Sequence, residues 1–226
     1  IDHLVVGAAS LDEGVAWCEA TLGLGPGPGG QHPLFGTHNR LLRLGSPDHP
    51  LAYLEIIAVN PDATPAREAP LRRWFDLDDP DLRQRLSSRG PQLIHWVVSV
   101  PDIEAACSAW RTMGSERGPV IEASRPTPQG LLRWRITVRD DGQRLFGGCL
   151  PTLIEWGNVH PGDHMPAPSL TLRSLTLHHP QAELLREALQ AIGITGVTAL
   201  PGPTGLQADL TSPDGAAISL SSQEPT

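Results

Sequence analysis

Four short apolar stretches of the chain each carry one metal-binding type of side chain. They span residues 1–6, 52–57, 93–98 and 152–156, and their polar members alternate as His3, Glu55, His95 and Glu155. Carboxylates and imidazoles are rarely buried in strands unless they are paired, because an isolated charge is costly away from water. A site shared by the four side chains is therefore one explanation of the pattern.

The elements around the first stretch follow a definite order. Residues 1–6 predict a strand, and Ser10 with Glu13 forms the capping-box signature of a helix over residues 11–22. Gly23 is placed to end that helix, and strands are expected at 41–44 and 51–59. The first part of the chain thus reads strand, helix, strands.

This order recurs twice farther along the chain. Strands are expected at 93–100, 120–121, 131–138 and 149–156 around a helix at 103–113, and again at 170–177, 197–200, 206–210 and 216–220 around a helix at 181–192. The repeat predicts an α+β fold of βαβββ modules, two of them paired and the third partial. The expected divisions are residues 1–60 for the first module, 61–92 for a helical connector interrupted at Pro80, 93–164 for the second module, and 165–226 for the third.

Spacing relates the polar residues of the first two copies. His3 lies 20 residues before Gly23, and His95 lies 19 before Gly114. Glu55 follows His3 by 52 residues, and Glu155 follows His95 by 60. The corresponding positions of the third copy hold Ser174 and Ser219, so the site is expected between the first two modules.

Two imidazoles and two carboxylates suit a borderline divalent ion such as Zn, Ni, Fe, Co or Mn. His3, Glu55, His95 and Glu155 are the expected ligands. The alternative is a polar pocket in which the same groups hydrogen-bond one another or a ligand.

The composition of the chain limits the kinds of partner that are expected. The 226 residues carry a net charge of −8 without a basic run, and no stretch has the roughly 20 apolar residues of a membrane span. Nucleic acid and membranes are therefore not expected as partners. The three cysteines are odd in number and form no CxxC motif, so a disulfide scaffold is not expected and a reducing cytoplasm fits best.

Several local motifs resemble the glyoxalase-like domain group of the vicinal oxygen chelate (glyoxalase/bleomycin resistance/extradiol dioxygenase) superfamily. The resemblance covers nearly the whole chain. It is carried by Asp2-His3-Leu4-Val5, Gly29-Gly30-Gln31-His32-Pro33, Gly36-Thr37-His38-Asn39, Tyr53-Leu54-Glu55-Ile56-Ile57, Arg125-Pro126, Gly130, Leu132-Arg133-Trp134 and Leu150-Pro151. The resemblance implies paired βαβββ modules around a cleft, usually with a divalent metal.

A second set of polar residues is expected near the cleft. His32, Thr37 and Asn39 lie in a Gly-rich segment and are expected to line the cleft mouth and hydrogen-bond a substrate. The alternative is that Thr37 and Asn39 satisfy turn backbone. Arg133 and Trp134 bind an anionic or planar ligand, or are a surface arginine beside a core tryptophan. His160-Pro161 follows the fourth strand of the second module and is expected to close one end of the pocket.

Two functions remain open from the residues. The first is a metal-dependent isomerase, lyase or dioxygenase in which the ion chelates two oxygens of a small substrate and Glu155 or Glu55 acts as general base. The second is a binding protein that sequesters a small molecule without chemistry. The third, ligand-free copy is expected to cover a sheet edge or to support a homodimer.

Overall fold

Two modules with the expected order of elements form the first part of the fold. The computed structural model describes residues 1–128, 130–168 and 170–222. The first module comprises β1 (His3–Gly7), α1 (Leu11–Leu22), β2 (Gln31–His32), β3 (Thr37–Gly45) and β4 (Tyr53–Val59). The second comprises β5 (Gln92–Ser99), α3 (Ile103–Thr112), β6 (Val120–Thr127), β7 (Gly130–Thr137), the short 3-10 turn η1 (Leu145–Gly148) and β8 (Thr152–Trp156).

The remaining elements connect and follow these modules. Helix α2 (Pro80–Arg89) lies between them. After the second module come η2 (Pro161–His164), β9 (Leu170–His178), α4 (Ala182–Ala191), β10 (Val197–Leu200), β11 (Gly205–Thr211) and β12 (Ala217–Ser221). None of the described helices combines the length and apolar character needed to cross a bilayer.

Local chemistry sets the helix ends. The Ser10 hydroxyl accepts from the backbone N–H of Glu13 at 3.2 Å, and Gly23 ends α1 with a left-handed φ of 69°. The expectation that Pro80 interrupts a helix is wrong. Asp79 caps α2 through the N–H of Leu82 at 2.8 Å, and Pro80 occupies the first turn, where a missing N–H costs nothing.

Strand pairing confirms the repeated modules. The strand order is β12-β11-β9-β3-β4-β1-β5-β8-β7-β6, with β2 beside β3 and β10 beside β9. In each of the first two modules the first strand runs parallel to the fourth, as β1 does to β4 and β5 to β8. Strands β1 and β5 pair antiparallel and join the modules at the centre of the sheet. The fold is therefore α+β, built on paired βαβββ units.

The third segment pairs its strands differently. Its elements follow the order strand, helix, three strands, but β9 lies between β10 and β11 rather than beside β12. Strand β9 also continues the sheet by pairing parallel to the end of β3. A local pattern of apolar residues fixes the order of elements along the chain but not which strands become neighbours, because register and partner depend on contacts distant in sequence.

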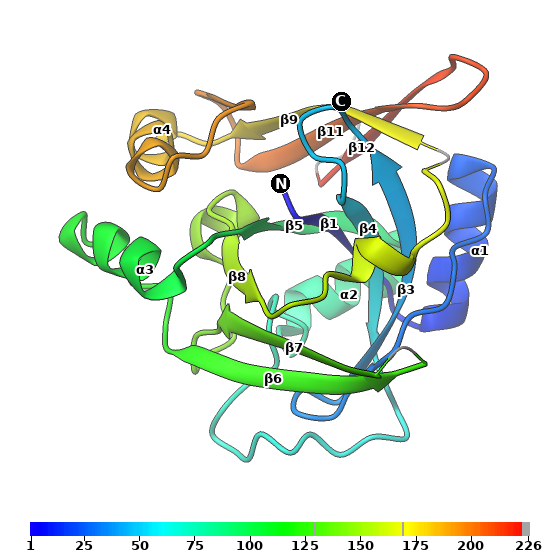
Figure 1. Ribbon diagram of the computed structural model, residues 1–226, viewed down its shortest axis with the longest axis horizontal. Coiled ribbons are helices and arrows are strands. Elements are labelled where there is room, and N and C mark those ends of the chain that lie inside the picture. The colour runs from blue at the N-terminus through cyan, green and yellow to red at the C-terminus, as the bar shows by residue number, and fades with distance from the viewer. Residues whose placement is uncertain (129, 169, 223–226) are drawn as a thin grey trace.

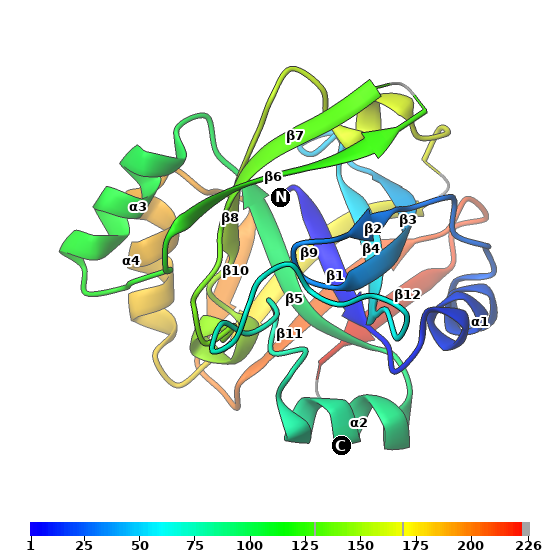
Figure 2. The ribbon, with the colours of Figure 1, turned by 90° about the horizontal axis from the view of Figure 1, so that it is seen from below.

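The central strands have an apolar core on each face. On one face, Leu4, Leu54 and Trp96 pack against the third segment and helices α1 and α3. On the other face, Val5, Ile57 and Ile154 pack against Trp74 and Phe75 of the connector and against β7. Figures 1 and 2 show β9, β11 and β12 as a layer on one side of β1 and β5, and the long β6–β7 hairpin on the opposite side.

Helices α3 and α4 lie side by side at one end of the molecule (Figure 1). The indole N–H of Trp110 on α3 donates to the carbonyl of Ala188 on α4 at 2.7 Å. This buried hydrogen bond ties the third segment to the second module.

Candidate active site

His3 and Glu55 face each other on neighbouring parallel strands. The register pairs His3 with Tyr53, so Glu55 lies two residues farther along β4 (55 − 53) and on the same face. The Nε2 atom of His3 lies 3.6 Å from Oε2 of Glu55. Both residues are 4% exposed, so this polar pair lies inside the fold.

Asp2 fixes the orientation of the His3 ring. Its Oδ1 accepts from Nδ1 of His3 at 2.6 Å, while Oδ2 accepts from Trp156 Nε1 at 2.7 Å and from His160 Nε2 at 3.1 Å. Burial alone would raise the pKa of Asp2, but the hydrogen bonds from His160 and His3 outweigh it and hold this pKa well below its usual value. Because Asp2 accepts the Nδ1 proton of His3, the other ring nitrogen, Nε2, is the one that faces Glu55.

Tyr53 holds the same ring from its face. The rings of His3 and Tyr53 stack with centroids 4.6 Å apart. Burial, together with the nearby Asp2 and Glu55 charges, raises the pKa of the Tyr53 hydroxyl well above its usual value, so it remains protonated. His3 is thus held at its edge by a carboxylate and on its face by an aromatic ring.

Asn39, His32 and Thr37 form a chain of hydrogen bonds that ends at Glu55. Asn39 Nδ2 donates to Glu55 Oε1 at 2.6 Å and lies 3.3 Å from His32 Nε2, while His32 Nδ1 lies 3.0 Å from the Thr37 hydroxyl. Burial, and secondarily Arg125, lowers the pKa of His32 to about 3, so His32 is neutral at pH 7. Asn39 thus holds the Glu55 carboxylate, and His32 and Thr37 support Asn39 from behind, while contact of these residues with a substrate stays a prediction.

Two glycines, Gly29 and Gly30, allow the segment before β2 to lie close to Asn39 on β3. The backbone N–H of Gly30 donates to Asn39 Oδ1 at 2.7 Å. A Cβ atom on Gly29 would lie 2.0 Å from the Asn39 carbonyl oxygen, so a larger residue there would push the two segments apart. The Gly29-Gly30 pair therefore positions Asn39, and through it Glu55.

A small inner cavity and a larger outer cavity lead to these residues. The inner cavity has a volume of about 30 Å³ and the outer one about 420 Å³. They share the side chains of Leu41, Arg125, Leu132 and Pro161 at the neck between them. The inner lining includes His3, Glu55, His32, Asn39, Tyr53, Arg125 and the aromatic rings of Trp74, Phe75, Trp134 and Trp156.

His95 does not reach this cavity. It is fully buried, its Nδ1 lies 3.0 Å from the Gly148 carbonyl oxygen, and its Nε2 lies 3.0 Å from the Thr152 hydroxyl. Burial and the nearby Arg117 lower its pKa well below the usual value, which keeps the ring neutral. Both ring nitrogens of His95 therefore have protein partners.

Glu155 points to the opposite face of β8. Its Oε2 accepts from the backbone N–H of Ile103, at the start of α3, at 2.8 Å, and its Oε1 lies 3.3 Å from Arg135 Nη1. Ile154 and Trp156 face the inner cavity, so the residue between them faces away. On β7, Trp134 lines the inner cavity and Arg133 lies on the outside, where it borders a separate surface groove with Glu155.

The counterpart of Glu55 in the second module is Thr152. His3 precedes the N-cap Ser10 by seven residues, and His95 precedes the N-cap Asp102 by seven. Val97 pairs with Thr152, so the register places residue 150 opposite His95 and Thr152 two residues beyond it (152 − 150), matching the offset of Glu55 from His3. The 60-residue spacing led to Glu155 because it is the only carboxylate in β8.

The residues present do not fit the expected four-ligand metal centre. Within residues 1–128, 130–168 and 170–222, no three His, Cys, Asp or Glu side chains are grouped so that they could hold a metal ion. Of the four expected ligands, only His3 and Glu55 face one another. His95 and Glu155 are turned to other partners, and Thr152 next to His95 accepts a hydrogen bond from the buried cation Arg117.

Three residues of the site were not selected from the sequence. Asp2 and Arg125 enter the sequence analysis only as parts of motifs, and Trp156 only as the last residue of an apolar stretch. The signal for Asp2 was a second charged residue beside His3 at the start of a buried strand. Arg125 had a weaker signal. Strand β6 alternates half-buried and exposed residues and has no fully buried apolar face, so a charged residue in it does not stand out.

Comparisons with known proteins agree with this architecture. A family model described as glyoxalase-like domain matches residues 1–193. A search of curated proteins finds no match. Among solved structures, a hypothetical protein from Staphylococcus aureus is 13% identical with a TM-score of 0.56, covering 96% of this chain and 83% of that one.

Two methylmalonyl-CoA epimerases are also similar. The Streptomyces coelicolor enzyme, solved as a variant in complex with 2-nitronate-propionyl-CoA, is 20% identical with a TM-score of 0.43, over 69% of this chain and 95% of that one. The Mycobacterium tuberculosis enzyme is 19% identical with a TM-score of 0.37, over 69% and 85%.

Paired βαβββ modules around a polar cavity define a protein of the vicinal oxygen chelate superfamily. Within that superfamily, the chain belongs to the glyoxalase-like domain family, whose model spans both paired modules and part of the third segment.

Proposed function

We propose that the protein is an enzyme of the isomerase or lyase type that transfers a proton on a small oxygenated substrate bound in the outer cavity with its reacting end at the inner cavity. The observation that carries this proposal is the arrangement of Asp2, His3 and Glu55. A neutral imidazole with its Nδ1 proton on a buried carboxylate has its Nε2 atom available as a general base. The Nε2 lone pair faces the cavity opposite a second carboxylate.

In this reaction His3 Nε2 takes a proton from a carbon next to a substrate carbonyl. The electron pair of the broken C–H bond moves into the carbonyl and gives an enolate. Return of the proton to another position or another face of the carbon gives an isomer, whereas departure of a leaving group gives a lyase product. Glu55, whose Oε1 accepts a hydrogen bond from Asn39, is the second acid–base group of this proposal and passes a proton to or from the substrate oxygen.

The aromatic lining supports the same chemistry. The rings of Trp74, Phe75, Trp134 and Trp156 line a cavity whose polar groups are already fixed by hydrogen bonds. Preorganised groups in a dry site need little rearrangement when charge develops on the substrate. Because His95 and Glu155 are turned to other partners, the proton transfer is assigned to His3 and Glu55 alone.

Exchange of substrate protons with solvent tests the proposal. The full chain is incubated in D₂O with a panel of α-hydroxy ketones, 2-oxo acids and acyl thioesters, and loss of C–H signal is followed by NMR. We expect exchange in at least one class, reduced by at least about 100-fold in His3→Asn and in Glu55→Gln. His179→Gln, which alters a histidine of the third segment, is the matched control and should leave the rate unchanged.

The alternative is sequestration without chemistry. Tight binding of a panel member by the wild-type chain, with no exchange above the uncatalysed rate, would contradict the enzyme proposal and favour that function. The two outcomes separate because binding is measured by quenching of tryptophan fluorescence and exchange by NMR.

A further inference from the structure

The outer cavity carries a charge opposite to that of the protein. The chain has 25 Asp and Glu against 17 Lys and Arg. Among the described residues that line the outer cavity there is no Asp or Glu, whereas there are two arginines, Arg43 and Arg125, and two histidines, His160 and His164. A cleft lined by one sign of charge attracts ligands of the opposite sign.

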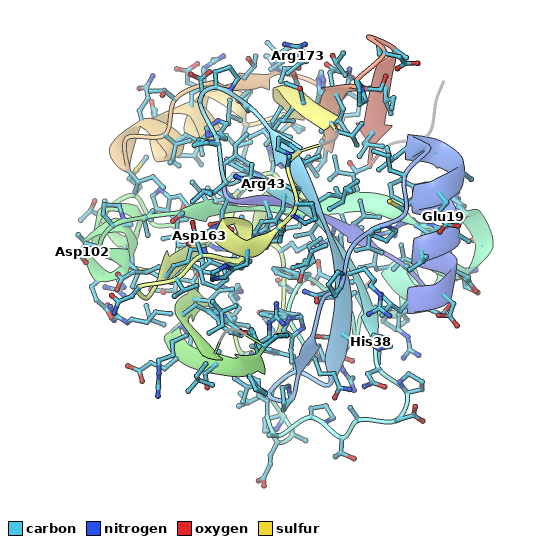
Figure 3. All side chains as sticks on the ribbon, turned by 45° about the vertical axis from the view of Figure 1, so that its right-hand side comes forward. Glu19, His38, Arg43, Asp102, Asp163 and Arg173 are labelled. Atoms are coloured by element: carbon cyan, nitrogen blue, oxygen red, sulfur yellow. The ribbon has the colours of Figure 1, made fainter. Side chains whose placement is uncertain are left out.

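Neither arginine forms an ion pair with a described carboxylate, although Glu55 is near enough to attract Arg125 electrostatically. The guanidinium of Arg125 donates to the Gly29 carbonyl at a long 3.4 Å. Arg43 donates to the carbonyls of Met165 at 3.3 Å and Pro50 at 3.1 Å, and its Nε is buried without a partner. Figure 3 shows Arg43 near the η2 segment that carries Asp163. Both guanidinium groups keep donors for an anion that the protein itself does not supply.

Arg125 stands at the neck between the two cavities. It lines the outer cavity together with Leu131 and Val159, and the inner cavity together with His3 and Glu55. A Cβ atom on Gly30 would lie 2.1 Å from Arg125 Nη1, so the absence of a side chain at Gly30 makes room for the guanidinium. The position is therefore built by the fold and is not a random surface site.

The rim of the outer cavity is apolar and exposed. Leu131 is 50% exposed and Val159 is 39% exposed, and they are two of the four large hydrophobic residues that are exposed in the described part of the chain. Exposed apolar residues that gather at a cavity mark a binding surface. The outer cavity thus offers an apolar rim beside a cationic neck.

We propose that the substrate is a small amphipathic anion, with a carboxylate or phosphate monoester bound by Arg125 at the neck. Its reacting end enters the inner cavity beside His3 and Glu55, and its apolar chain lies against Leu131 and Val159. The placement of the reacting end rests on the proposed function. The anion site does not, because it is inferred from the residues at the neck between the two cavities. Arg125 is the residue that determines specificity.

Binding of matched eight-carbon probes tests the inference on the full chain. Octanoate, octyl phosphate and octanol are titrated against tryptophan fluorescence at fixed ionic strength. Because a charge-assisted hydrogen bond in a partly buried site is worth about a tenfold change in affinity, octanoate or octyl phosphate should bind about tenfold tighter than octanol. The tighter of the two anions identifies the substrate group as a carboxylate or as a phosphate.

Variants assign the preference to the neck. Arg125→Gln should weaken the preferred anion about tenfold and leave octanol within about twofold. Gly30→Ala should act in the same direction by displacing the guanidinium. The matched control is Arg133→Gln, an exposed arginine of the adjacent strand that faces away from both cavities, and it should change neither affinity. Equal binding of anions and octanol, or an unchanged anion affinity in Arg125→Gln, would overturn the inference.

His3→Asn separates this inference from the proposed function. The variant should retain the anion preference and lose proton exchange. If the preference is present but no substrate exchanges a proton, the proposed function fails and the anion site stands. If exchange occurs on neutral substrates and Arg125→Gln has no effect on binding, the anion site fails and the proposed function stands.

Discussion

His95 contacts Thr152 in the second module as His3 faces Glu55 in the first. The two pairs occupy matching positions of the repeat, but one pair lines a cavity and the other is closed by Gly148 and Arg117. Glu55 and Thr152 thus occupy equivalent positions of the repeat, and only Glu55 is a carboxylate. Chemistry is expected from one module and structural support from the other.

Asp2→Asn should reduce proton exchange by at least about 100-fold, because the amide no longer keeps the His3 proton on Nδ1. The measurement is the NMR exchange rate on the best substrate of the panel. Asp163→Asn is the control, since Asp163 binds the backbone of His160 and lies outside the cavity. Unchanged exchange in Asp2→Asn would show that the ring orientation is not needed.

Glu155→Gln should leave exchange within about twofold, because this carboxylate accepts from the first N–H of α3 and does not face the cavity. Gln keeps an oxygen acceptor but removes the negative charge from the helix N-terminus and from Arg135, so the free energy of unfolding should fall by about 0.3–1 kcal/mol. Urea unfolding and the exchange assay are run on the same protein. A loss of exchange as large as in Glu55→Gln would restore Glu155 to the catalytic site.

Thr152→Val should lower the free energy of unfolding by about 2–4 kcal/mol, because it removes the acceptor of the buried Arg117. The Nε and Nη1 atoms of Arg117 have no partner among the described residues, so the cation depends strongly on Thr152. Thr152→Ser keeps the hydroxyl and should cost about 1 kcal/mol or less. Adding Arg117→Met to Thr152→Val should recover part of the loss, and urea unfolding measures all three.

Stability should fall as the pH decreases from neutral because His32 is buried in its neutral form. Its folded-state pKa of about 3 lies below the unfolded value near 6.5, so the unfolded chain takes up the proton first. The contribution of neutral His32 to the free energy of unfolding is fully present above pH 6.5 and is lost toward pH 3. About 1.4 kcal/mol of it is lost by pH 5.5. His32→Gln should show a smaller drop between pH 7.5 and 5.5, whereas the exposed His164→Gln should behave as the wild type.

Chelation should leave proton exchange unchanged, because the residues present do not assemble the four-ligand centre. Elemental analysis of the purified protein should show less than one equivalent of Zn, Ni, Fe, Co or Mn. One equivalent of metal that is lost in the His3→Ala/Glu55→Ala variant would contradict this prediction and would assign the pair to a metal site.

The order of elements and the approach of His3 to Glu55 could be predicted from the sequence, because capping residues, glycine stops and apolar periodicity are local signals and the two residues lie in adjacent predicted strands. Ser10, Gly23 and the position of His3 beside Glu55 are examples. Sequence spacing could not identify Thr152 as the partner of His95. Residues that pair between the first and fourth strands are 50 positions apart in the first module but 55 apart in the second, where the segment containing η1 is inserted before the fourth strand. The pairing of β9 was hidden for a related reason, since it depends on contacts with β3 that are distant in sequence.

The layer formed by β9, β11 and β12 buries the face of β1 and β5 opposite the site, so the strands that hold His3 are covered on both sides. Amide hydrogens of β1 should consequently exchange with solvent only by global unfolding, whereas those of η2 exchange by local opening. A ligand is then expected to enter past η2, while β1 and β4 beneath it stay rigid and hold His3 and Glu55 in place.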